Sequence, residues 1–223
     1  MREHIAEYGG DPNFIVCGGE SAGGHLSSLL ALTPNLPEYQ PGFEDMDTSV
    51  KGCVNLYGVM DLTDHKELYI AKGKNIRHFI EKVVLRSDLA KHPEVFRKAS
   101  PMWRIEGTHP LPRFMIVHGT IDTLVPYEDG RHFFRLLTKQ RHLDSKSSVS
   151  KTLSGVLAAT EELPDSDERE NAWNSKDLFV KLPATHHAFN FVVSPRTLAL
   201  SDAVVNFLAD LLHQERSASL SKL

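Results

Sequence analysis

The sequence contains a serine whose neighbours are spaced for nucleophilic catalysis. Residues Gly19-Glu20-Ser21-Ala22-Gly23 fit G-x-S-x-G, the pattern of a sharp strand-to-helix turn that exposes a reactive hydroxyl. Small residues two positions before and after Ser21 let neighbouring backbone pass close to that turn. Because a helix follows, the backbone N–H of Ala22 is a candidate donor to a developing oxyanion. The main alternative, a phosphate-binding loop, would need Lys-Ser/Thr where this sequence has Gly24-His25.

A serine nucleophile requires a general base and an acidic residue that orients the base. Asp122 lies shortly after one apolar run, and His186 and His187 lie shortly after a later run. The order serine, aspartate, histidine is the chain order of the triad in one fold class of hydrolases. We therefore expect Asp122 to be the acid, with both histidines as candidates for the base.

The other histidines and the cysteines are expected to be structural. His118 should shape the end of a strand, and His25 should pack within a helix. Cys17 and Cys53 are too few for a disulfide framework, and neither has the spacing of a metal ligand. We expect them to be core thiols on neighbouring strands, and we expect neither a metal nor a cofactor.

Short apolar runs alternate with longer periodic segments and predict the elements that position these residues. Strands are predicted over 14–17, 53–57, 114–117 and 177–182, and helices over 22–32, 75–85, 127–140 and 195–213. Residues 1–8 should be the last turns of a helix that two glycines stop. This alternation is typical of an α/β fold with a mostly parallel sheet flanked by helices. Ser21, Asp122 and the two histidines should then meet at the carboxyl edge of the sheet.

The same pattern predicts which faces are buried. The strand over 14–17 should be buried on both faces, and the uncharged helix over 22–32 should also be buried. The helix over 75–85 should pack through Phe79, Val83 and Val84. The helix over 127–140 should use Phe133, Phe134, Leu136 and Leu137. The last helix should use Leu198, Val204, Val205, Leu208, Leu211 and Leu212.

Length and composition indicate a globular domain. The 223 residues are 41% hydrophobic and 24% charged, and their net charge of −4 argues against a general nucleic-acid-binding protein. No apolar run approaches the length of a membrane span, and the polar N-terminus is not that of a signal peptide. Residues 144–176 are rich in serine and acidic residues, which predicts a flexible surface insertion; a regulatory phosphorylation loop is the weaker interpretation.

The sequence resembles the α/β-hydrolase superfamily, on the branch of hormone-sensitive-lipase-like esterases and bacterial carboxylesterases. The resemblance rests on Tyr8-Gly9-Gly10-Asp11-Pro12 and on the run from Gly18 to Leu26 around the serine. It rests also on His118-Gly119-Thr120-x-Asp122-x-x-Val125-Pro126 and on His187-Ala188-Phe189. It implies that Ser21 is the nucleophile, Asp122 the acid and His187, rather than His186, the base.

The resemblance covers nearly the whole chain except the predicted insertion, but it starts inside the family's fold. Members of the superfamily have further strands before the elbow and an upstream His-Gly-Gly segment that completes the oxyanion hole, and this sequence has neither. We therefore expect a single α/β-hydrolase domain over 1–223 that is incomplete at its N-terminus. Its first strand should be a hydrophobic sheet edge.

The resemblance implies a serine hydrolase that cleaves small to medium acyl esters through a Ser-His-Asp triad and an acyl-enzyme. Amide or lactone hydrolysis would use the same triad. The alternative function is that of a catalytically impaired or inactive truncated hydrolase-fold protein that acts as a binding protein.

The last three residues, Ser221-Lys222-Leu223, match the address read by the peroxisomal import receptor. They predict that receptor as a partner and a peroxisomal location, and otherwise the protein would be cytoplasmic. The interior of the peroxisome and the cytoplasm are both reducing, which suits two unpaired cysteines.

Overall fold

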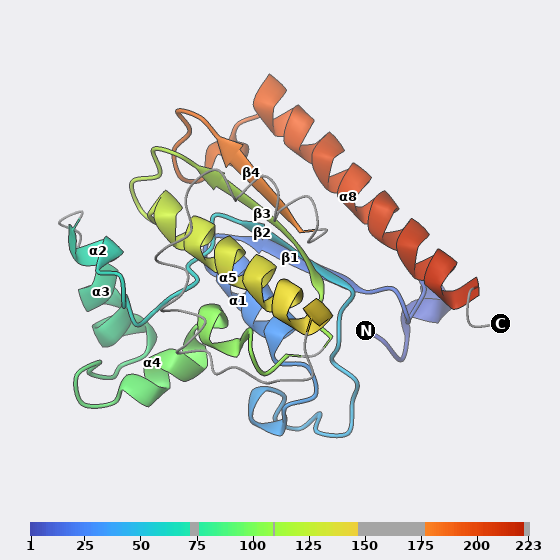
Figure 1. Ribbon diagram of the computed structural model, residues 1–223, viewed down its shortest axis with the longest axis horizontal. Helices are drawn as coiled ribbons and strands as arrows, with labels where there is room; N and C mark the ends of the chain where they lie inside the picture. The colour runs from blue at the N-terminus through green and yellow to red at the C-terminus, as the bar shows by residue number, and fades with distance from the viewer. Residues whose placement is uncertain (72–75, 109, 147–176, 221–223) are drawn as a thin grey trace.

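Four parallel strands form the centre of the molecule in the computed structural model, which describes residues 1–71, 76–108, 110–146 and 177–220 (Figure 1). The strands are β1 (Val16–Glu20), β2 (Gly52–Leu56), β3 (Arg113–Gly119) and β4 (Leu178–Leu182). They lie in the order β1-β2-β3-β4, and every neighbouring pair is parallel. Each predicted strand overlaps an observed one, and the α/β class is confirmed.

The register of the strands brings their carboxyl ends to one edge of the sheet. Glu20 at the end of β1 pairs with Leu56 at the end of β2, and Leu56 pairs with Val117 near the end of β3. Gly119 then pairs with Leu182 at the end of β4. The segments that leave this edge carry the residues predicted to act together.

Helices cover both faces of the sheet. α1 (Ala22–Leu32) and α5 (Tyr127–Lys146) lie on one face, and α8 (Pro195–Leu220) lies on the other (Figure 1). Successive residues of β3 face opposite layers, as the period of a strand requires. Phe114 packs in the cluster that contains Phe133 of α5, whereas Met115 packs in the cluster that contains Phe207 of α8. The four α5 residues predicted to be buried are all buried.

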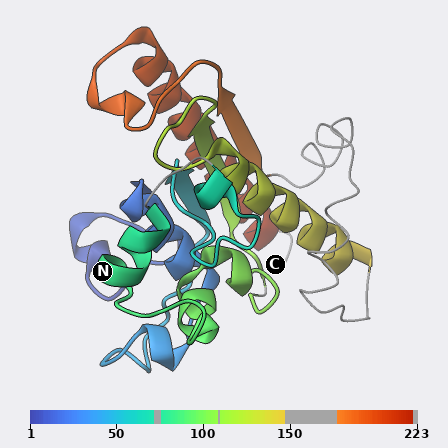
Figure 2. The same ribbon diagram turned by 90° about the vertical axis from the view of Figure 1, so that its left-hand side faces the viewer.

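Short helical segments, rather than one long helix, connect β2 to β3. They gather at one end of the molecule, opposite α8 (Figure 1, Figure 2). These segments are α2 (Leu68–Ala71), α3 (Ile76–Phe79), a π-helical turn (Ile80–Val84), α4 (Pro93–Ala99) and a 3₁₀ turn (Pro101–Arg104). Further 3₁₀ turns are formed by Pro37–Tyr39 and Phe189–Phe191.

The predicted packing of the segment 75–85 is wrong. Phe79, Val83 and Val84 are each more than half exposed, and Ile80 instead packs with Leu62 in a third apolar cluster. The π-helical turn breaks the 3.6-residue period on which the prediction rested, so a different side chain faces the core.

The N-terminal elements are shorter than predicted. Residues 1–8 contain a 3₁₀ helix (Ile5–Tyr8), which Gly9 ends in the left-handed conformation with a φ of 80°. β1 begins at Val16 rather than Phe14, and its residues are only partly buried. β1 lies at one end of the four-stranded sheet and has only one neighbouring strand, β2, among the described residues. A strand with a neighbour on one side only is less fully buried than a central strand.

Helix α1 is not buried all round, although it carries no charged residue. Ala31 and Leu32 are buried in the core, whereas Leu26 is 62% exposed and Leu30 is 45% exposed. The prediction that the whole helix is buried, which rested on its lack of charged residues, is therefore wrong: only one face of α1 is covered.

Helix α8 is longer than predicted, and it packs through a partly different face. It continues past His213 to Leu220. Its most buried side chains are Leu200, Phe207 and Leu211, whereas Leu198 and Val205 are exposed. The sheet below selects one stripe of the helix, and the sequence contains apolar residues on more than one stripe.

The predicted insertion over 144–176 overlaps the end of α5. α5 continues to Lys146, so the first three residues of 144–176 belong to that helix. The remainder, 147–176, lies outside the described residues. In the ranges that the structure describes, no helix is both long and apolar enough to cross a bilayer.

A pair of substitutions on α8 tests this packing. Phe207→Ala should lower the free energy of unfolding by about 3–5 kcal/mol, because it leaves a cavity between α8 and the sheet. Val205→Ala, on the exposed face, should change it by less than about 0.5 kcal/mol. Urea unfolding followed by circular dichroism measures both values, and equal effects would contradict the observed orientation of α8.

Candidate active site

Ser21 occupies a strained turn between β1 and α1. Its φ is 51° and its ψ is −118°, a conformation that non-glycine residues rarely adopt. Two backbone hydrogen bonds hold the turn: Ser21 N–H donates to Leu56 O over 2.9 Å, and His25 N–H donates to Ser21 O over 3.0 Å. The side chain is thereby lifted clear of the sheet at the start of the helix, as the G-x-S-x-G pattern predicts.

The glycines around Ser21 allow this turn, but not all in the way that the pattern suggests. A Cβ atom on Gly19 would lie 2.6 Å from the carbonyl carbon of Gly23, so only glycine fits there. A Cβ atom on Gly23 would meet nothing within 4 Å. The expectation that both flanking residues must be small to let backbone pass is correct for Gly19 and wrong for Gly23.

The structure brings Ser21, His187 and Asp122 into one hydrogen-bonded chain. His187 Nε2 lies 2.9 Å from Ser21 Oγ, and His187 Nδ1 lies 2.7 Å from Asp122 Oδ2. If Nδ1 donates to the carboxylate, Nε2 is free to accept the serine proton. His186, the other candidate base, is exposed, and the contacts to Ser21 and Asp122 are made by His187. The arrangement can therefore activate the Ser21 hydroxyl as a nucleophile.

Asp122 is held ionised by its hydrogen bonds. Burial by itself would raise the pKa of this carboxyl, but hydrogen bonds from His118 and His187 outweigh it and hold the pKa well below its usual range. The backbone N–H groups of Leu124 and Val125 also donate to Asp122 Oδ1, over 2.8 and 2.9 Å. His118 is fully buried at the end of β3, as expected for a residue that shapes the strand end.

An apolar cleft of about 620 Å³ opens beside Ser21. Apart from Ser21 and His25, every side chain that lines it is apolar. The lining residues are Ser21, Ala22, His25, Val59, Leu62, Ile76, Phe79, Ile80, Val84, Leu124 and Val125. The exposure of Phe79 and Val84 now has a reason, since both face this cleft.

His25 is one of the two polar residues that line the cleft. Its Nδ1 lies 2.7 Å from Val59 O, and burial lowers the pKa of the ring despite that contact. The residue lies one helical turn after Ser21 on α1, so it faces the same side as the serine. The expectation that His25 merely packs within a helix was too narrow.

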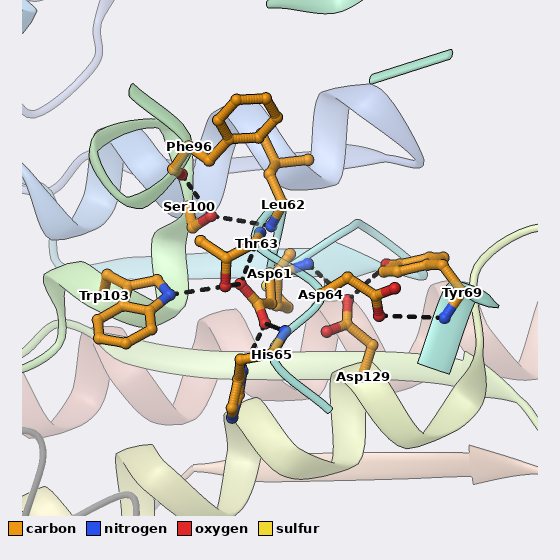
Figure 3. A network of polar contacts seen from close by, with 11 residues as sticks. Asp61, Leu62, Thr63, Asp64, His65, Tyr69, Phe96, Ser100, Trp103 and Asp129 are labelled. Carbon is orange, nitrogen blue, oxygen red and sulfur yellow. Dashed lines mark hydrogen bonds and ion pairs between the residues drawn. The ribbon is translucent and has the colours of Figure 1, made fainter. Parts of the chain in front are cut away.

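A buried polar network supports the loop that forms one wall of the cleft (Figure 3). Asp61 accepts hydrogen bonds from the Thr63 hydroxyl and the Trp103 indole, and it contacts His65 Nδ1 at 2.5 Å. No pattern in the sequence predicts this network. Its signal, polar residues just after the strand over 53–57, is present but does not indicate their partners.

Asp129, in the first turn of α5, joins this network from the opposite side (Figure 3). Its Oδ2 accepts hydrogen bonds from Met60 N–H over 2.7 Å and from the Tyr69 hydroxyl over 3.0 Å. Complete burial, reinforced by the nearby charge of Asp61, raises the pKa of Asp129 to about 8. The protonated acid thus fastens the loop to α5 at neutral pH.

The remaining predicted residues are Ala22 and the two cysteines. Ala22 begins α1 directly after Ser21, so its N–H belongs to the first turn of the helix and has no partner within it. Cys17 and Cys53 are register partners on β1 and β2, and both are free thiols. Within the described ranges, no three His, Cys, Asp or Glu side chains are grouped to hold a metal ion.

A parallel sheet with a nucleophile elbow, an acid after β3 and a histidine after β4 defines an α/β-hydrolase. Residues 1–137 match the family described as BD-FAE, and the chain belongs to that family.

Curated relatives agree with this family. The chain is 35% identical over 219 residues to "Probable carboxylic ester hydrolase LipM" and 33% identical over 223 residues to "Esterase LipQ", both of Mycobacterium tuberculosis (strain ATCC 25618 / H37Rv). These alignments cover 98% and 100% of this chain. They cover 42% and 44% of the two relatives, so the chain spans less than half of their length.

A solved structure shares the fold. It is a thermophilic esterase, Est2, from the Planctomycetes species Thermogutta terrifontis, with a TM-score of 0.53 and 21% sequence identity. The likeness covers 92% of this chain and 58% of that one.

The raised pKa of Asp129 predicts a pH-dependent stability. The pKa of about 8 in the folded state lies above the value of about 3.9 in an unfolded chain. The stabilisation is therefore complete below about pH 4 and is lost as the pH rises through about 8. Asp129→Asn keeps an acceptor for Met60 and Tyr69, so the melting temperature of this variant should fall less between pH 5 and 9 than that of the wild type.

Differential scanning fluorimetry across this pH range measures the effect. Asp202→Asn, a change at an exposed carboxyl of α8, is the matched control and should follow the wild type. Parallel curves for the wild type and Asp129→Asn would show that Asp129 does not titrate in this range.

Proposed function

We propose that this chain is a serine hydrolase that cleaves carboxylic esters. The observation that carries the proposal is the chain of contacts from Ser21 Oγ to His187 Nε2, at 2.9 Å, and from His187 Nδ1 to Asp122 Oδ2, at 2.7 Å. Two relatives that align with nearly the whole length of this chain are named as an esterase and as a probable carboxylic ester hydrolase. Their names support an ester as the bond that is cleaved.

The reaction follows from this geometry. Ser21 Oγ attacks the ester carbonyl carbon while His187 Nε2 takes the hydroxyl proton, and Asp122 stabilises the imidazolium that forms. The backbone N–H of Ala22 donates to the carbonyl oxygen as its charge develops. His187 returns the proton to the leaving alcohol, and an acyl-enzyme remains on Ser21. Water then attacks this ester while His187 takes its proton. The bond between the acyl carbon and Ser21 Oγ breaks, His187 returns the proton to Ser21 Oγ, and the acid is released.

The cleft supports small to medium apolar acyl groups as substrates. It lies beside Ser21, and its lining offers a substrate apolar contacts and no charged partner. An acyl chain that fills it would be removed from water, whereas a charged group would lose its hydration without compensation.

Covalent labelling tests the nucleophile. A fluorophosphonate probe should label the purified chain, and Ser21→Ala should abolish labelling and lower kcat on p-nitrophenyl butyrate by at least about 10⁴-fold. Ser201→Ala, on the exposed surface of α8, is the matched control and should be labelled like the wild type. A folded wild-type chain without labelling or turnover would favour the alternative, an inactive hydrolase-fold protein with a binding role.

We propose further that Ser221-Lys222-Leu223 directs the protein to peroxisomes through the import receptor. The tripeptide matches the address that the receptor reads. It follows directly on α8, whose last residue, Leu220, is exposed. Without import the protein would remain in the cytoplasm.

Microscopy tests this location. A fluorescent protein fused to the N-terminus should colocalise with a peroxisomal marker, because the C-terminus stays free for the receptor. Deletion of Leu223 should leave the fusion diffuse. A diffuse wild-type fusion would contradict the proposal.

A further inference from the structure

Three polar side chains meet beside His187 and play no part in the proton relay. Glu20 is the last residue of β1 and precedes Ser21, Tyr57 follows β2, and Asn190 lies in the 3₁₀ turn three residues after His187. The Tyr57 hydroxyl donates to Glu20 Oε2 over 2.6 Å and is also in contact with Asn190 Oδ1. Asn190 Nδ2 donates to Glu20 Oε2 over 2.5 Å. We call these three residues the polar clamp.

Only one residue of the polar clamp, Glu20, carries a charge. Hydrogen bonds from Tyr57 and Asn190 lower the pKa of Glu20, so its carboxylate is ionised at neutral pH. Burial, followed by the contact with Glu20, raises the pKa of Tyr57 well above its usual range, so the phenol keeps its proton. A carboxylate that accepts from a phenol and an amide forms charge-assisted hydrogen bonds, which are stronger than neutral ones.

The segment that carries His187 needs such an anchor because its backbone is strained. Ala184 and Ala188 flank the histidine with φ values of 49° and 55°, in the left-handed region that disfavours residues with a Cβ atom. Before His187 the segment is fastened to the turn after β3, since Ala184 N–H donates to Thr120 Oγ1 and Ile121 N–H donates to Thr185 O. After His187, Asn190 fastens it to β1 and β2.

The ring of Tyr57 also contacts the base directly. Its centroid lies 4.6 Å from that of His187, edge to face, and 5.6 Å from that of Phe189. Tyr57 is almost fully buried, and its N–H donates to Val117 O over 2.8 Å. One residue therefore supports the imidazole face and fixes the turn that follows it.

We propose that Glu20, Tyr57 and Asn190 are positioning residues that hold the His187 imidazole in line with Ser21. This inference rests on the proposed function, because it assigns the clamp a role in the same reaction. Freed from Asn190, the segment around His187 would move relative to the nucleophile, and the proton transfer would become slower. None of the three clamp residues lines the apolar cleft, so binding of the acyl group should be unaffected.

Kinetics of clamp variants test this role. Asn190→Ala and Tyr57→Phe should each lower kcat by about 10- to 100-fold with KM nearly unchanged, because a small misplacement of a catalytic group costs about that much. Tyr57→Phe keeps the ring and removes only the hydroxyl. The matched control is Asn35→Ala, which removes another asparagine side chain, one that accepts a hydrogen bond from Thr48 N–H far from the site; its kcat should equal that of the wild type.

An exchange of charges separates positioning from general stability. Asn190→Asp alone places a second carboxylate against Glu20 and should lower kcat further than Asn190→Ala. The double variant Glu20→Gln, Asn190→Asp again offers one carboxylate and one amide to Tyr57, so it should recover much of the lost kcat. A role in stability alone would lower the melting temperature and leave kcat of the folded fraction unchanged.

The outcomes distinguish this inference from the proposed function. If the wild type is active and kcat is unchanged in Asn190→Ala and Tyr57→Phe, the role of the clamp is overturned and the proposed function stands. The same holds if kcat of the double variant is as low as that of Asn190→Asp. A wild type that no probe labels would overturn the proposed function, and the catalytic role of the clamp with it.

Discussion

The parallel pairing of four strands is the constraint on which the site depends. Ser21 and His187 are 166 residues apart, and His187 and Asp122 are 65 apart, yet each leaves the sheet at the same edge. Parallel strands in register deliver every strand end to that edge, whatever the length of the connections between them. The relay is therefore a product of β-sheet pairing, and apolar burial on both faces of β3 keeps that pairing fixed.

Backbone strain gathers where these strand ends meet. Ser21, Tyr57 and Ala188 all have φ values between 45° and 55° although none is glycine. Such conformations persist only where surrounding contacts over-determine them. Here the contacts are the backbone bond from Ser21 to Leu56, the bond from Tyr57 to Val117 and the polar clamp. The strain and its compensation lie in or directly beside the residues that perform the proposed chemistry.

The surroundings of His187 and the cleft beside Ser21 differ in chemical character, and each suits its task. Around the histidine lie ionised carboxylates of low pKa, Asp122 and Glu20. The cleft is apolar, and its wall is fastened to α5 by the protonated Asp129. The imidazolium formed during turnover would thus be surrounded by negative charge, while the acyl group rests against apolar side chains.

The amino-acid sequence by itself determined the strand order along the chain, the turn at Ser21 and the positions of Asp122 and His187 after strands. Those features are local, because alternating apolar runs and glycine spacing act within a few residues. Only the tertiary structure decided between His186 and His187 by contact, and only it showed that Glu20, Tyr57 and Asn190 meet. It also decided which stripe of α8 is buried and that Phe79 and Val84 face a cleft. Such choices depend on which surfaces from distant segments are packed together, and no local pattern encodes that.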